Sequence, residues 1–150
     1  MFDGEGFRVR RTRLGLTQAE VAARSGVPQP NISSIENGRV EPSSATVERL
    51  ERALQRRPSE ALAEHRVALI ELGTRLGISD LRVFGSVLRG EDTVESDLDL
   101  VGTLAPGLSY FDLAEFEIAA EQLLGVPVEV VPSGSAGRVA RRILVEAQRL

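Results

Sequence analysis

The chain has 150 residues, a formal net charge of −4, and 27% charged against 42% hydrophobic residues. It contains no Cys and one His, and its 18 basic residues are all Arg, which excludes disulfides, thiolate zinc sites, cysteine nucleophiles and lysine-dependent chemistry. No apolar run reaches the roughly 18 residues of a membrane span, and the N-terminus lacks a signal-peptide pattern. We expect a cytoplasmic protein that does not contact a membrane.

Charge is distributed unevenly along the chain. Residues 1–57 carry 10 Arg and 7 acidic residues, whereas residues 58–150 carry 8 Arg and 15 acidic residues. Between these parts, Pro58 is expected to end one helix and Ser59 to cap the next. The sequence therefore predicts two domains, 1–57 and 58–150, and an α+β protein overall.

Short helical patterns separated by turn signals occupy residues 7–54. Thr17 and Glu20 have the spacing of a capping box, and Gly26 suits the left-handed residue that ends a helix. A second helix is expected to follow and to end at Asn37–Gly38, before another that Ser43 or Ser44 caps. Two short helices joined by a tight glycine turn form the geometry that places the second helix in a DNA major groove.

The motifs LTQAEVA at 16–22, Gly26–Val27, Ile32–Ser33, Ile35–Gly38 and Pro42–Ser43 resemble the XRE/Cro-type helix-turn-helix domain over about residues 7–55. The resemblance implies an all-α, lambda-repressor-like head that binds DNA. The DNA-facing residues that it implies are Gln18, Gln29, Asn31, Ser33 and Ser34, with Asn37 and Arg39 near phosphates. Gln and Asn can pair with adenine, and Arg neutralises phosphate. The alternative is a set of solvated polar residues on a small bundle.

The prolines of the second helix depart from this family. Where relatives usually have a capping Ser or Thr, this chain has Pro28, and Pro30 follows in the first turn. Proline is tolerated there, but the capping hydroxyl is lost and Pro30 has no N–H to offer a phosphate.

Residues 59–76 form a helical pattern that is followed by a short β-like run at 80–84 and a sharp turn at Gly85–Ser86. Ser86 and the free N–H groups of a helical turn beginning there are expected to form an anion cradle. A further helix is expected at 109–124, with Tyr110, Phe111 and Phe116 in the core.

Acidic and apolar residues alternate from Asp97 to Val101, so Asp97 and Asp99 share one face of a predicted strand. Two like charges side by side repel each other, and a divalent cation such as Mg²⁺ relieves that repulsion. Alternation alone is equally compatible with two exposed acids on an edge strand.

The segment FGSVLRG at 84–90 followed by SDLDL at 96–100 resembles the signature of the DNA polymerase β nucleotidyltransferase superfamily, specifically its minimal (MNT) branch, over about residues 62–150. The resemblance implies a small α/β domain with a mixed sheet, a third strand at 126–131 and a final helix at about 139–150. It implies that Gly85 and Ser86 hold the phosphates of ATP with Arg89 nearby, and that Asp97 and Asp99 hold Mg²⁺.

Glu129 lies in the predicted third strand, where that family supplies another carboxylate and typically has Asp. The resemblance implies that it binds a second metal or acts as the general base. A plain acid at the strand edge is the alternative.

Minimal nucleotidyltransferases that resemble this chain pair with HEPN-domain toxins and inactivate them by adenylylation. The implied function is an antitoxin that transfers AMP from ATP to a toxin hydroxyl, represses its own operon by binding the operator, and forms a homodimer or a hetero-oligomer with the toxin. Three alternatives remain: a DNA-binding regulator whose second domain binds nucleotide or a partner without catalysis, an enzyme that modifies a small molecule, and an antitoxin that acts by binding alone.

Overall fold

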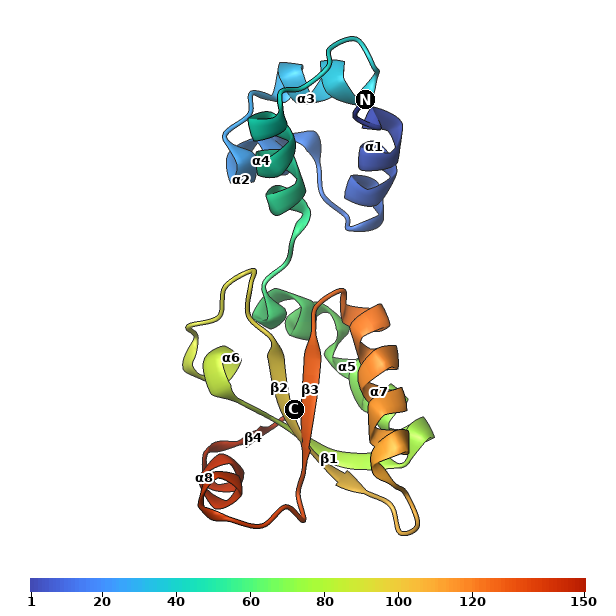
Figure 1. The fold of residues 1–150 in the computed structure, drawn as a ribbon, viewed down its shortest axis with the longest axis vertical. Helices are drawn as coiled ribbons and strands as arrows, with labels where there is room; N and C mark the ends of the chain where they lie inside the picture. Colours follow the sequence, from blue (N-terminus) through green and yellow to red (C-terminus); the bar gives the residue numbers. More distant parts are fainter. The chain divides into compact units, whose positions relative to one another are not determined.

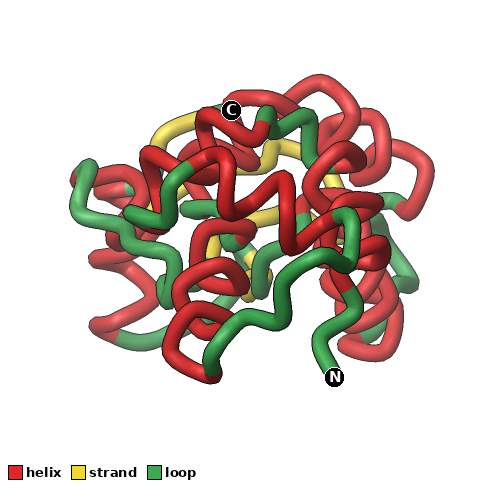
Figure 2. The backbone as a smooth tube through the Cα atoms, turned by 90° about the horizontal axis from the view of Figure 1, so that it is seen from above, coloured by secondary structure: helices red, strands yellow, loops and turns green.

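The computed structural model describes residues 1–150, which form two compact units, Met1–Gln55 and Arg56–Leu150 (Figure 1). We call the first unit the head and the second the body. The regular elements of the head are all helices, whereas the body combines helices with a four-stranded sheet. Figure 2 colours the helices red and the strands yellow. This is the α+β architecture that the sequence predicts. None of the helices is both long enough and apolar enough to span a lipid bilayer.

The helices of the head are α1 (Gly4–Arg13), α2 (Gln18–Ser25), α3 (Gln29–Glu36) and α4 (Ser44–Leu54). All four contribute apolar side chains to one core. Its fully buried members are Phe7, Val21, Ile32 and Leu50. Helices α2 and α3 with the turn between them form the predicted helix-turn-helix.

The ends of α2 follow from its sequence. The Thr17 hydroxyl accepts a hydrogen bond from the Glu20 N–H at 3.1 Å, and the Glu20 carboxylate accepts one from the Thr17 N–H at 2.7 Å. Gly26 ends the helix at φ +69°. Pro28 precedes α3, which has no side-chain cap. The capping box and the glycine turn are therefore confirmed, and α3 starts without a hydroxyl cap, as Pro28 predicts.

The elements of the body are α5 (Pro58–Leu76), β1 (Ile78–Phe84), α6 (Gly85–Arg89), β2 (Leu98–Leu104), α7 (Tyr110–Leu124), β3 (Val128–Pro132), α8 (Arg138–Glu146) and β4 (Gln148–Arg149). The strands form one sheet in the order β3-β2-β1-β4. Strand β2 pairs in parallel with β3, whereas β1 pairs antiparallel with β2 and with β4. The sheet is therefore mixed, as predicted.

The core of the body lies between the sheet and helices α5 and α7, which pack side by side (Figure 1). Leu98 and Leu100 of β2 are fully buried on this face, together with Leu69 of α5 and Phe116 of α7. Side chains alternate along a strand, so Asp99 projects from the opposite face of the sheet. The apolar pattern of β2 thus decides which face carries the acids.

The end of the chain differs from the prediction. The final helix ends at Glu146, and Gln148–Arg149 form a short strand against β1. The Leu150 N–H donates to the Leu81 carbonyl at 3.0 Å, and Ala147 is buried at the change of direction. A backbone that pairs with the open edge of β1 satisfies hydrogen-bonding groups that a continued helix would leave exposed there.

The start of α7 also differs from the prediction. Phe116 is fully buried, as expected, but Tyr110 and Phe111 are 77% and 88% exposed. The inward face of α7 consists of residues at three- and four-residue spacing from Leu113 to Leu124. Phe111 lies outside that face, and Tyr110 in the first turn lines an open hollow, so the expectation that they belong to the core is wrong.

Candidate functional site

The turn between β1 and α6 brings the backbone of Gly85 close to the carboxylate of Asp99. Gly85 has φ +72°, a left-handed conformation that favours glycine. A Cβ at this position would lie 2.4 Å from Oδ2 of Asp99, so the carboxylate would have to move to make room for a side chain. The left-handed backbone and the contact with Asp99 therefore both favour glycine at the position where the sequence predicts a close backbone approach.

The first turn of α6 has unused hydrogen-bonding groups. No side chain caps this helix, and the Ser86 hydroxyl makes no hydrogen bond within the protein. Arg89, in the same short helix, has an exposed side chain that pairs with Glu91 at 2.9 Å. Gly85, Ser86 and Arg89 are thus adjacent in one element that also contacts β2, the strand of Asp99.

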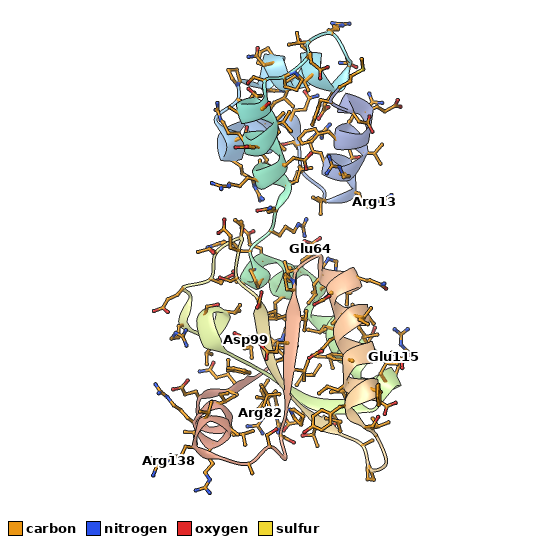
Figure 3. All side chains as sticks on the ribbon, viewed as in Figure 1. Arg13, Glu64, Arg82, Asp99, Glu115 and Arg138 are labelled. Atoms are coloured by element: carbon orange, nitrogen blue, oxygen red, sulfur yellow. The ribbon has the colours of Figure 1, made fainter.

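The acids of β2 and β3 lie side by side. Asp99 and Glu129 are register partners in the parallel pair β2–β3, so their side chains project from the same face. Asp97 stands two residues before Asp99, at the point where β2 begins. Figure 3 labels Asp99 on β2 beside α6. The structure therefore brings all six residues of the predicted catalytic and nucleotide site to one end of the sheet.

Electrostatics distinguish Asp99 from an ordinary surface acid. Partial burial, followed by the negative charges of Glu129 and Asp97, raises the pKa of Asp99 above its usual value, and Arg89 opposes the shift. Asp97 and Glu129 are exposed, whereas Asp99 is half-buried between them and α6. The site has more negative charge than its single arginine balances, and a bound cation would stabilise it.

These residues fit a hard divalent cation such as Mg²⁺. Such ions take carboxylate oxygens and complete their coordination with water and substrate phosphates. No group of three or more His, Cys, Asp or Glu side chains already converges at metal-binding distance. Asp97 and Asp99 would thus supply part of the coordination, and the phosphates of a nucleotide held at Gly85–Ser86 would supply more.

Three acids that the sequence analysis missed accept backbone hydrogen bonds around this site, two of them from β3 and one from the start of α5. Glu117 and Glu121 of α7 accept hydrogen bonds from the outer N–H groups of β3, Val130 at 2.8 Å and Val128 at 3.1 Å, on either side of Glu129. Asp92, buried in the loop before Asp97, accepts a bond from the Ser59 N–H at 2.8 Å. The sequence shows the four-residue spacing of Glu117 and Glu121, but the backbone N–H groups that they bond are set by tertiary packing.

A buried ion pair joins α1 to α3 in the head, and a glutamine of α2 bonds to the same carboxylate. Arg11 and Glu36 form two hydrogen bonds, of 2.6 and 3.0 Å, with side chains that are 9% and 1% exposed. The Gln18 amide also donates to Glu36 at 2.8 Å. This network fixes the start of α2 against the end of α3, because Gln18 begins one helix and Glu36 ends the other.

The predicted DNA-facing residues differ in their internal bonding. The side chains of Gln29, Asn31 and Arg39 are exposed and make no hydrogen bond or ion pair within the protein. The half-buried Ser34 donates to the Pro30 carbonyl, and Asn37 donates to the carbonyl of the half-buried Ser33. Gln29, Asn31 and Arg39 therefore have the most bonding capacity left for DNA.

Comparison with known proteins identifies the family to which the body belongs. The family model described as "Nucleotidyltransferase domain" matches residues 62–150. The chain belongs to this family. A solved structure of a protein assigned as a minimal nucleotidyltransferase shares 42% sequence identity with a TM-score of 0.56, over 61% of this chain and 95% of that one. Protein adenylyltransferase MntA of Thermococcus cleftensis is 35% identical over 77 residues, which are 51% of this chain and 78% of the relative.

A second comparison concerns the head. The helix-turn-helix family model matches residues 7–60. An HTH-type transcriptional regulator of Methanothermobacter thermautotrophicus is 47% identical over 49 residues, which are 33% of this chain and 71% of the relative. The chain thus joins an XRE-type helix-turn-helix to a minimal nucleotidyltransferase domain, as the motifs predict.

Proposed function

We propose that this protein is an antitoxin that transfers AMP from ATP to a hydroxyl group of a HEPN-type toxin and represses its own operon through the head. The observation that carries the proposal is the position of Asp99, which lies against the glycine turn of α6 and in register with Glu129, with Asp97 two residues before it. The adenylyltransferase relative supports a protein as the acceptor. The fused helix-turn-helix supports operator DNA as the second ligand.

The chemistry assigned to these residues is an in-line displacement at the α-phosphorus of ATP. The acceptor oxygen forms a bond to the α-phosphorus, the bond to the β-phosphate oxygen breaks, and pyrophosphate leaves. Mg²⁺ held by Asp97 and Asp99 would neutralise charge on the triphosphate. The N–H groups at Gly85–Ser86 and the Arg89 guanidinium bind the leaving phosphates.

We assign to Glu129 the role of general base, which takes the proton that the toxin hydroxyl loses. It lies beside Asp99 on the exposed face of the sheet, where an incoming hydroxyl can reach it. A carboxylate in that place takes the proton as the oxygen attacks. Glu117 and Glu121 keep β3 in place while this occurs, because they bond the N–H groups on both sides of Glu129.

The decisive experiment titrates a HEPN-type toxin with this protein, with and without ATP and Mg²⁺. An enzyme silences an excess of toxin, and the toxin stays inactive after the protein is removed, with an added mass of about 329 Da per AMP on the acceptor hydroxyl. Protection that needs one equivalent and no ATP would contradict the enzymatic proposal. The variant with both Asp97→Asn and Asp99→Asn is the control, since it keeps the shape of the site and removes two charges.

Autoregulation is tested separately with the upstream DNA of the operon. The head is expected to bind this DNA, and the Asp97→Asn, Asp99→Asn variant is expected to bind it as tightly as the native protein because the two units have separate cores. Equal affinity for operator and random DNA would contradict operator recognition. Loss of DNA binding in the double variant would contradict the independence of the two units.

A further inference from the structure

The body has a hollow that the proposed transfer reaction does not use. It has a volume of about 480 Å³ and lies where β2 and β3 end. Its lining includes Leu104, Leu108, Tyr110, Pro132 and Ser135. The catalytic acids stand where these strands begin, and a seven-residue strand spans about 20 Å. The hollow is therefore a separate feature at the opposite end of the sheet.

Two adjacent aromatic side chains project into solvent at the same end. Tyr110, in the lining of the hollow, is 77% exposed, and Phe111 beside it is 88% exposed. The chain has only one Tyr, five Phe and no Trp, so a third of its aromatic side chains are these two. Large exposed aromatic groups are typical of protein interfaces, where they bury much area at little entropic cost.

The two segments that form this end of the body carry no charged side chain, although Asp112 and Arg138 directly follow them. No charged residue occurs from Leu100 to Phe111 or from Val130 to Gly137, although 27% of the chain is charged. The next acid in the sequence, Asp112, accepts hydrogen bonds from Ser109 at the start of α7. Residues 58–150 carry 8 Arg and 15 acidic residues, so two copies of the body repel each other wherever their charged surfaces meet. They can approach at the neutral end.

We propose that the neutral end, defined by Tyr110, Phe111 and the hollow, is the surface on which a second copy of this chain docks. A two-fold contact uses the same patch on both copies, so the patch must complement itself. It does so here, because it combines a projecting Phe111 with a hollow whose walls include the apolar side chains of Leu104, Leu108 and Pro132. In the dimer, Phe111 of each copy enters the hollow of the other.

A second copy fits better than the other partners that this protein needs. A toxin that receives AMP must reach Asp99, at the opposite end of the sheet. Helix-turn-helix heads bind operators as pairs, one for each half-site, so a dimer is required for tight binding. In the head, the large exposed apolar side chains are Met1, Val9 and Val40, none of them aromatic. The body therefore offers the more suitable surface for pairing.

The test measures the mass of the full-length protein in solution, without DNA or nucleotide, by sedimentation equilibrium over a range of concentrations. We expect the mass of two chains for the native protein. Phe111→Asp is expected to raise the dissociation constant by about 30-fold or more, as for a central interface residue. The matched control is Val67→Asp, on α5, where the side chain is 69% exposed and distant in sequence from the neutral end; it should dimerise normally.

A second variant and a fluorescence measurement distinguish loss of dimerisation from misfolding. Gly134→Arg places a charge in the lining at a position where a Cβ meets nothing within 4 Å, so it should fold and dissociate. Since Tyr110 is the only Tyr and Trp is absent, tyrosine emission reports on this surface alone. Its quenching by acrylamide should weaken as the native protein dimerises and stay constant with concentration in Phe111→Asp.

Three results would overturn the proposal. They are a native protein with the mass of one chain at every concentration, a Phe111→Asp variant that stays dimeric, and a Val67→Asp variant that dissociates equally. A DNA measurement then tests the consequence: only the native dimer should prefer DNA with two half-sites over DNA with one. The mass measurement needs neither catalysis nor DNA, so its failure is distinguishable from failure of the proposed function.

Discussion

Replacing Gly85 with alanine perturbs the closest contact of the candidate active site. The new Cβ would lie 2.4 Å from Oδ2 of Asp99 on a backbone at φ +72°. Gly90 provides a matched control, because it ends the same helix at φ +69° and its Cβ would meet nothing within 4 Å. Both substitutions place alanine in a left-handed conformation, and only one of them displaces a carboxylate.

The expected losses of stability follow from the cost of the left-handed backbone and the cost of displacing the Asp99 carboxylate. The left-handed backbone costs alanine about 1–2 kcal/mol at either position. At Gly85 the Asp99 side chain must also move by about 1 Å, and overpacking of this kind adds about 1–3 kcal/mol. Gly85→Ala should therefore lower the free energy of unfolding by about 2–5 kcal/mol and Gly90→Ala by about 1–2 kcal/mol. Nucleotide transfer should fall steeply only in Gly85→Ala, since only there is a metal-binding carboxylate displaced.

A double-mutant cycle with Asp99→Ala isolates the steric term. Without the carboxylate, the nearest remaining atom of residue 99 is its Cβ at 3.4 Å, an ordinary contact. Gly85→Ala should then cost no more than Gly90→Ala does, as measured by calorimetric unfolding of the full chain. If Gly85→Ala costs the same with and without the Asp99 carboxylate, or if both glycine variants transfer AMP equally well, the argument from this contact is refuted.

Three further predictions concern the charges and the DNA-facing residues. Asp99→Asn should raise the melting temperature of the metal-free protein at pH 7, because the raised pKa of Asp99 means that its ionised form destabilises the fold. This gain in melting temperature should shrink as the pH falls and Asp99 becomes protonated. A gain that does not depend on pH would contradict the prediction. Arg11→Met should cost about 3–5 kcal/mol of unfolding free energy by leaving the Glu36 charge buried without its partner, and a cost below 1 kcal/mol in urea unfolding would contradict it. Gln29→Ala should weaken operator binding by about 1–3 kcal/mol and random DNA far less, whereas Arg39→Ala should weaken both alike and lower the salt dependence in titrations.

Local sequence was sufficient for the features that depend on neighbouring residues. The capping box at Thr17, the glycine turn at Gly26 and the alternation around Asp99 involve residues at most four positions apart. Such features reflect hydrogen bonds within one turn or the two-residue period of a strand. The two-part architecture was predictable as well, because each motif set matches its own domain family.

Tertiary structure decided which residues meet across the sheet and which ends stay open. The sequence does not show that Glu129 lies in register with Asp99, that Gly85 leaves room for the Asp99 carboxylate, or that Glu117 and Glu121 bond the edge of β3. It also favoured a helix to the last residue and a core position for Phe111, whereas the chain end pairs with β1 and Phe111 is exposed. The physical reason is the same in each case: pairing along a sheet edge and burial against a neighbouring element depend on residues far away in the chain, and local propensity carries no information about them.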